Sequence, residues 1–449
     1  MKLEQNLLCV HLNEFNYEYL QKGAKKYKCK NIEKLLKLKK IHTFTNDKQQ
    51  NKNLDPWVQS VSINTGIKST KHKIFNLGQK IHPKFIQIWD ALSQKKISCS
   101  VWGTMNSKLN YNKYIDLYFP DPWNYNDAPF PKNLQSLYLL PNYYAKNYLD
   151  FSILKITYFA LFFFVGCLKN NLLNFFSKKI FFFSKIILKI GIKNFLLFFV
   201  LDLISINILY EKLRIKKSRF SMIFLNSLAH FQHNNWDESE NEKYYFMLTE
   251  EIFKKIFEIK KLYRSIIIFN GFTQKKIEAE FLLRPKNPSI FLKNLNINFI
   301  NLEQDMTNGG FLYFSDTAEI KKAINILSNF NLFGMKLFYV KKYPNNSLFY
   351  KIQIKSFIKL NLEKIKKINS GNIEKYLGFY DKKLKFNYAD AVDDEALKIF
   401  IENIEHIKCT GIHINTGVII YENLKNNKLI LKNKIENHKI FNLIENHFK

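Results

Sequence analysis

Several side chains that can bind a metal ion follow predicted strands of this 449-residue chain. Asn13 and Glu14 come directly after the apolar stretch Leu7–Leu12, and Asn270 ends another such stretch. Because the carboxyl ends of parallel strands gather at one edge of a sheet, we expect these groups to share a cleft. The alternative for Asn13 and Glu14 is an ordinary helix start, in which Asn13 caps the helix and Glu14 favours its dipole.

Histidines add imidazole groups to the same predicted edge. His230 and His233 are three residues apart and follow a predicted strand, so both could bind one metal ion, or could be loop histidines with hydrogen-bonding roles. His413 lies between two glycines, which give the backbone room for a close approach. We therefore predict that the metal-site residues are Glu14, His230, His233, Asn270 and His413, with Asn270 as a neutral neighbour.

A polar loop leads into a helix at Asp55–Gly66. The free N–H groups at a helix N-terminus attract an anion and favour an ionised nucleophile placed there. The alternative is a capped amphipathic helix without a role in chemistry.

Short apolar strands alternate with polar helical stretches on both sides of residues 150–215. This alternation predicts an α/β protein with one mostly parallel sheet between helices, as a single domain over residues 1–449. The expected strands are Leu7–Leu12, Ile97–Trp102, Ile115–Phe119, Ser221–Asn226, Ser265–Asn270, Phe311–Ser315 and Val418–Tyr421. We also expect a helix around Phe85–Ser93, and a hairpin of Lys336–Val340 with Leu348–Ile354.

Residues 150–215 form a hydrophobic, basic insertion that we expect to be a helical cap outside the sheet. Its uncharged run Ile156–Leu168 has thirteen residues, short of the roughly 20 that span a bilayer. At 100° per residue, four lysines share one helix face beside Phe and Ile, as in a helix that lies on a membrane surface: Lys178, Lys185, Lys189 and Lys193. A cap packed on its own core, with its lysines in water, fits the pattern equally well.

The formal net charge of +31 attracts phosphates, anionic lipids and acidic substrates. The lysines are spread along the chain without an Arg-rich segment, so we do not expect nucleic acid as a partner. The five cysteines are scattered, and the chain begins with a predicted strand in place of a signal segment. Both features predict a cytoplasmic protein, with peripheral membrane contact through residues 150–215 as an option.

The order of these motifs resembles the alkaline phosphatase superfamily, in particular its type I phosphodiesterase and phosphomutase-like branch. The corresponding places are Asn13–Glu14, Pro56–Gly66 with His72, Ala229–His233, Phe269–Phe272 and Gly411–Gly417. The resemblance implies a three-layer α/β sandwich, two divalent metal ions, usually zinc, and a hydroxyl nucleophile. The nucleophile position falls on Pro56, so the nearest candidates for a catalytic group are Asp55 and Ser60.

Other positions depart from the superfamily pattern. The resemblance implies Asp–Gly at residues 13 and 14, an Asp at Ala229 and an Asp–His pair at Phe269–Asn270. A site with one metal ion, held by Glu14, His230 or His233 and His413, remains compatible with the sequence, as does a site with none. We expect a metal-dependent hydrolase or transferase for a phosphate or sulfate ester, such as a polysaccharide, a lipid head group or a nucleotide-like diester. The alternatives are a catalytically degenerate protein that binds an anionic glycan or lipid, and a membrane-surface scaffold.

Overall fold

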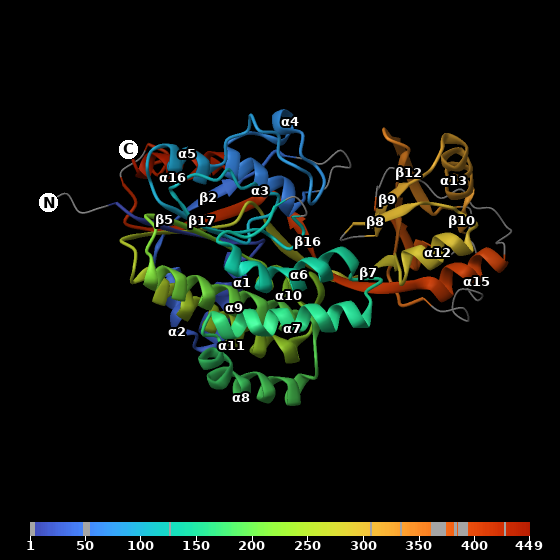
Figure 1. Cartoon of the computed structure of the whole chain (residues 1–449). Coiled ribbons are helices and arrows are strands. Elements are labelled where there is room, and N and C mark those ends of the chain that lie inside the picture. The colour runs from blue at the N-terminus through green and yellow to red at the C-terminus, as the bar shows by residue number, and fades with distance from the viewer. Residues whose placement is uncertain are drawn as a thin grey trace. The chain divides into compact units, whose positions relative to one another are not determined.

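The computed structural model describes residues 5–47, 54–124, 127–305, 308–332, 335–360, 374–380, 384, 394–425 and 428–449. The chain divides into two compact units (Figure 1). Unit 1 contains Met1–Ala145, Ser152–Lys276 and Gly411–Lys449, and unit 2 contains Lys146–Phe151 and Ile277–Thr410. The sequence predicts a single domain with one sheet, and the structure differs by this second unit.

Unit 1 is built on an eight-stranded sheet. Its strands are β1 (Leu7–Leu12), β2 (Lys39–Phe44), β3 (Cys99–Trp102), β4 (Ile115–Phe119), β5 (Phe220–Leu225), β6 (Ser265–Phe269), β17 (Thr416–Glu422) and β18 (Lys434–Glu436). Their order in the sheet is β18-β2-β17-β6-β1-β5-β3-β4. Every neighbouring pair is parallel except the two made by β17, which runs antiparallel to β2 and β6. The mostly parallel sheet predicted from the sequence is therefore confirmed.

Helices cover both faces of this sheet (Figure 1). The helices of unit 1 are α1 (Tyr17–Tyr27), α2 (Lys30–Leu36), α3 (Pro56–Thr65), α4 (Ser69–His72), α5 (Ile88–Gln94), α6 (Gln135–Asn147), α7 (Ile153–Lys169), α8 (Leu173–Ile190), α9 (Asn194–Ile215), α10 (Ser227–Asn234), α11 (Ser239–Lys260) and α16 (Ile440–His447). Successive side chains of a strand point to opposite faces. In β1, Leu8 and Val10 pack with α1, α2, α9, α10 and α11, whereas Leu7 and Cys9 pack with α3, α5 and α16. The predicted three-layer α/β class is confirmed for unit 1.

Unit 2 has a hydrophobic core of its own, which includes Leu283, Phe291, Leu312 and Tyr350. Its helices are α12 (Pro288–Asn294), α13 (Thr317–Asn329) and α15 (Asp394–Asn403). Its strands are β8 (Asn301–Gln304), β9 (Gly309–Tyr313), β10 (Asn331–Leu332), β11 (Met335–Lys336), β12 (Phe338–Tyr343), β13 (Ser347–Ile352), β14 (Ile354–Ser356) and β15 (Leu377–Phe379), and β7 (Thr273–Pro285) and β16 (Ile404–Ile414) cross the unit boundary. The predicted hairpin is confirmed as β12 and β13, but it pairs with β9 and β8 in a separate sheet. The expectation that all strands share one sheet is therefore wrong.

The insertion at residues 150–215 is helical, as predicted, but its three helices differ in burial. α9 is buried in the core of unit 1 and connects β4, through α6–α8, to β5, so it is a layer of the fold and not a cap. α7 and α8 keep many large apolar side chains exposed. Among the described residues no single helix is long and apolar enough to cross a membrane, whereas α7 and α8 meet that test together, with a bend of 114° between them.

Asp202 interrupts the apolar surface of α9 for a structural reason. Its carboxylate accepts backbone N–H groups of Asn226 and Ser227, at 3.0 and 2.8 Å, and so satisfies the free donors at the start of α10. Burial raises the pKa of Asp202 to about 7, against the opposing effect of these hydrogen bonds.

The buried carboxyl of Asp202 predicts a pH dependence of stability. Its pKa of about 7 in the folded protein lies above the unfolded value of about 3.9, so its stabilising contribution is complete below about pH 4 and is lost as the pH rises through 7. Asp202→Asn keeps an acceptor oxygen but cannot ionise. Between pH 4 and pH 8, the free energy of unfolding of the variant should therefore rise relative to wild type by up to about 4 kcal/mol. Urea denaturation at a series of pH values measures this difference, and a difference that does not change with pH would contradict it.

Candidate metal centre

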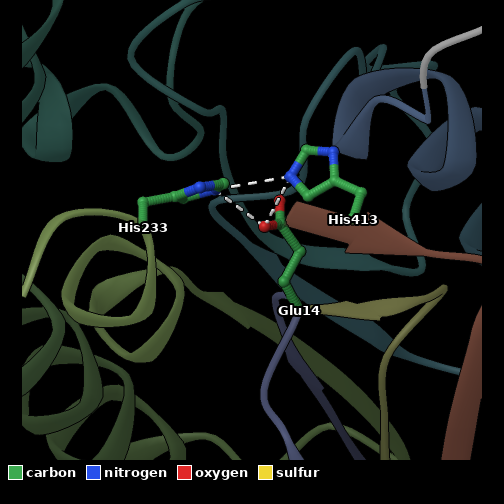
Figure 2. A group of neighbouring side chains, drawn as sticks. All are labelled: Glu14, His233 and His413. Carbon is green, nitrogen blue, oxygen red and sulfur yellow. Dashed lines mark hydrogen bonds and ion pairs between the residues drawn. The ribbon is translucent and has the colours of Figure 1, made fainter. Parts of the chain in front are cut away.

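Glu14, His233 and His413 converge at the carboxyl edge of the parallel strands (Figure 2). The Oε2 atom of Glu14 lies 2.9 Å from Nε2 of His233 and 2.9 Å from Nε2 of His413. The two Nε2 atoms are 3.4 Å apart. All three residues belong to unit 1: Glu14 follows β1, His233 lies on α10 after β5, and His413 lies at the end of β16 just before β17. The predicted convergence of these three residues is therefore present in the structure.

Glu14 occupies a backbone conformation that favours glycine, with a φ of 53°. Its carbonyl accepts hydrogen bonds from Gln232 Nε2 at 3.0 Å and from the hydroxyl of Thr273 at 3.2 Å, which hold the turn in place. The superfamily pattern has Asp–Gly here, and the left-handed φ shows why a glycine suits the second position. In this chain, that second position supplies the carboxylate, and Asn13 donates to its Oε1 atom at 3.0 Å.

The surroundings of the triad orient its donor atoms. His413 donates through Nδ1 to the carbonyl oxygen of Leu54, at 2.5 Å, which leaves its Nε2 atom facing Glu14. Gln274 donates through Nε2 to Glu14 Oε2, at 2.6 Å, and to the carbonyl of Ala229 on α10, at 3.2 Å. Hydrogen-bonded partners of this kind fix the tautomer of a histidine and the position of a carboxylate at metal sites.

Charge keeps Glu14 ionised although its side chain is buried. Burial raises the pKa of Glu14, but the nearby imidazoles of His413 and His233 outweigh it and hold that pKa well below its usual range. For His413, burial lowers the pKa, and the carboxylates of Glu14 and Asp55 outweigh it, so the pKa is raised. The triad therefore offers a carboxylate and two imidazoles at one point.

The donor set fits a divalent metal ion. Two histidines and one glutamate form a ligand set of catalytic zinc, in which a fourth position stays open to water or substrate. Around a tetrahedral ion with bonds of about 2.0–2.2 Å, ligand atoms lie about 3.3–3.5 Å apart. The two Nε2 atoms, 3.4 Å apart, match this spacing, whereas Glu14 Oε2 lies 2.9 Å from each of them, at hydrogen-bond length, and would have to move slightly to admit an ion. The side chains of His233 and His413 keep 31% and 22% of their surface exposed, so the site is reachable from solvent. Within the described residues, this is the one group of three or more ligands that the structure brings together.

Two residues predicted as part of the metal site have other roles. His230 stacks on Phe198 of α9, with ring centroids 3.3 Å apart, and its Nε2 atom bonds the side chain of Asn226 at 3.1 Å. Burial lowers its pKa to about 3. Asn270 donates to the carbonyl of Phe15, at 2.8 Å, and accepts the N–H of Val418, at 2.7 Å. It therefore connects the end of β6 to the segment after β1 and to β17. Neither side chain belongs to the triad.

The two predicted catalytic residues also differ from each other. Asp55 is the N-cap residue of α3, is largely buried, and lies close enough to His413 to raise its pKa. Ser60 lies inside the same helix with no exposed surface, and its hydroxyl donates to the carbonyl of Met105 at 3.1 Å. A hydroxyl held in this way is not presented to a substrate, so the structure supports Asp55 and not Ser60 beside the triad.

The sequence did not reveal Gln232 and Gln274, which support Glu14 from α10 and β7. Neutral amides have no distinctive spacing, so their role follows only from the folded arrangement. One signal was available: Gln274 comes four residues after Asn270, at the same strand end that the sequence marks as functional.

No family model matches the chain, and no curated protein matches it. Solved structures that align with 99% of the chain include phosphonoacetate hydrolase from Sinorhizobium meliloti, at 11% identity, 96% coverage of that chain and a TM-score of 0.40. They also include human ectonucleotide pyrophosphatase/phosphodiesterase 5 (99% of this chain and 95% of that chain, 9% identity, TM-score 0.42) and its murine counterpart (99% and 95%, 10%, 0.43). At these TM-scores the likeness carries no argument, so the function has to be argued from the residues of this chain.

Gly411 allows β16 to approach Gln232 and Gln274 closely, and this approach positions His413. A Cβ atom at this position would lie 2.3 Å from Gln274 Oε1 and 2.7 Å from the backbone carbonyl of Gln232, both closer than normal contact. Gly411→Ala should therefore lower the free energy of unfolding by about 1–3 kcal/mol, because the carbonyl cannot move without its helix. Urea denaturation tests this, and an unchanged midpoint would show that the close approach is not required.

Proposed function

We propose that the chain is a metal-dependent hydrolase or transferase of a phosphate or sulfate ester, with one divalent metal ion held by Glu14, His233 and His413. The observation that carries the proposal is the triad itself: a buried carboxylate oxygen within 2.9 Å of two imidazole nitrogens, at the sheet edge where α/β proteins bind ligands. The ligand set favours zinc among the common metals, although two histidines and one carboxylate also suit iron(II).

An anionic substrate fits the charge of the chain. The net charge of +31 gives the protein a positive field that attracts phosphate and sulfate groups. A bound divalent metal ion supplies Lewis-acid polarisation of a phosphoryl or sulfuryl oxygen and lowers the pKa of water. The imidazoles of His233 and His413 are partly exposed, so such a substrate can approach the triad from solvent.

We assign the other roles in the proposed reaction to residues around the triad. Glu14, kept ionised by the two imidazoles, balances positive charge at the centre of the site. The carboxylate of Asp55 helps to raise the pKa of His413, and we propose that it acts as the general base or the nucleophile. Gln274 and Asn13 hold the carboxylate of Glu14 by two amide hydrogen bonds and thus fix the position of the triad.

The alternative is an anion-binding protein without catalysis. It is favoured by the positions where the superfamily pattern has ligands for a second metal ion. Ala229 is buried, and its carbonyl accepts a hydrogen bond from Gln274. Asn270 is bonded to backbone on both sides. Activity therefore has to come from one metal ion and Asp55, and the experiments below separate the two possibilities.

Metal content gives one test of the proposed centre. Purified protein that has been dialysed against zinc should retain about one ion per chain by inductively coupled plasma mass spectrometry. Loss of a ligand in His233→Ala or His413→Ala should weaken zinc binding at least about 100-fold. His82→Ala, which removes an exposed histidine elsewhere, is the matched control and should leave the stoichiometry unchanged. Wild-type protein without bound metal, or His413→Ala with normal affinity, would contradict the proposed centre.

Turnover of model esters gives a separate test. The zinc-loaded protein should hydrolyse at least one of p-nitrophenyl phosphate, bis-p-nitrophenyl phosphate and p-nitrophenyl sulfate, and a chelator should abolish the reaction. Asp55→Asn should keep its metal and lose about 100-fold or more in kcat/KM, as expected when a general base is removed. Normal metal binding without turnover of any ester would instead support the anion-binding alternative.

A further inference from the structure

α8 exposes an apolar face to solvent, on the side away from the core of unit 1. Its inward side chains Phe175 and Ile186 are buried, whereas Phe181 and Leu188 on the opposite face are 82% and 85% exposed. Ile180, Ile187 and Leu173 lie on the same outer side and are also exposed. Figure 1 shows α8 at the bottom of unit 1, and α8 packs against α11.

α7 also exposes large apolar side chains. Ile153, Leu154 and Leu161 are 74%, 84% and 63% exposed, and Tyr158 and Phe164 are more than half exposed. Large apolar side chains exposed on two consecutive helices are typical of an interaction site. We refer to the exposed faces of α7 and α8 as the α7–α8 surface.

The charges around the α7–α8 surface favour one kind of partner. Residues 151–201 contain seven lysines and no Asp or Glu. On α8, Lys178, Lys185 and Lys189 are exposed and follow one another along one side of the apolar face. A lysine side chain can lay its methylene groups along an apolar surface while its ammonium group stays in water or among head groups. A second protein would need an apolar face with an acidic border to fit, whereas a bilayer with anionic lipids offers both properties at once.

We propose that α7 and α8 bind the surface of a membrane that contains anionic lipids, with Phe181, Leu188, Leu154 and Leu161 inserted among the acyl chains. The orientation is interfacial and not spanning. The uncharged stretch Ile156–Leu168 is about 20 Å long at 1.5 Å per residue, less than the ~30 Å of a hydrocarbon core. The lysines along α8 would be unfavourable within that core but favourable at its edge.

Vesicle flotation of the full chain tests the proposal. The probes are phosphatidylcholine vesicles without and with about 30 mol % phosphatidylserine, at about 0.1 M and about 0.5 M salt. Binding should be at least about tenfold tighter to the anionic vesicles and should weaken at the higher salt. Phe181→Ser with Leu188→Ser, and Leu154→Ser with Leu161→Ser, should each weaken binding about tenfold or more. These side chains are exposed, so circular dichroism and the urea midpoint should not change.

Two matched controls separate the α7–α8 surface from general attraction to a basic protein. Leu431→Ser removes a leucine that is 84% exposed elsewhere in unit 1, and should bind vesicles like wild type. Replacing Lys178, Lys185 and Lys189 with Gln should weaken anionic binding about 10- to 100-fold. The same change at Lys22, Lys25 and Lys28, exposed on or next to α1, should have little effect.

Three results would overturn the proposal. The first is no flotation, or equal flotation with both kinds of vesicle. The second is an equal loss of binding in the two lysine variants, which would mean that net charge alone is responsible. The third is a wild-type dimer in analytical ultracentrifugation that the serine variants dissociate, without vesicle binding, which would make the surface a contact between copies of the chain. None of these results depends on the metal centre, because all of them use binding and not turnover.

Discussion

The arrangement of the site depends on one constraint, the buried negative charge of Glu14. An ionised carboxylate away from water is unfavourable unless hydrogen bonds and opposite charge compensate it. Here the compensation comes from Asn13, His233, Gln274 and His413, which lie in separate segments of the chain. These segments meet because β1, β5 and β6 are parallel and end at one edge, and because β17 enters the sheet from that same edge. A divalent metal ion would complete the same compensation with the same atoms.

The sequence predicted the triad but not the division of roles around it. Glu14, His233 and His413 could be named because they follow or precede strands, and topology then brings them together. Spacing could not distinguish His230 from His233, since residues three apart lie on nearly the same face of a helix. Only the folded contacts show that His233 reaches Glu14 while His230 stacks on Phe198 of α9. Asn270 has the right position, but its amide is used by neighbouring backbone, which only the folded contacts reveal.

Local patterns predicted the elements better than their partners. The bounds of β1 and β4 agree with the expected strands, and the β12–β13 hairpin formed where Pro344–Asn346 indicated a turn. The error lay in assigning all strands to one sheet. β9 has the same apolar character as the strands of unit 1, yet it pairs with β8 and β13 over a separate core. Strand pairing is a long-range choice that alternation within one strand does not encode.

The apolar side chains of residues 150–215 are buried in α9 but largely exposed in α7 and α8. This difference determines how the function of the segment can be tested. α9 is buried on most sides, and its buried acidic residue, Asp202, caps α10 and so helps to position His233. The single carboxylate within the apolar run Phe195–Tyr210 was the available sign of such a role, because an unpaired charge would not be buried there. α7 and α8 bury little of their apolar surface. Deleting the whole segment would therefore damage the core and the metal centre together, whereas substitutions on the exposed faces of α7 and α8 change the surface alone. Any loss of membrane binding in those variants can be assigned to the α7–α8 surface, provided that the triad still binds its metal ion.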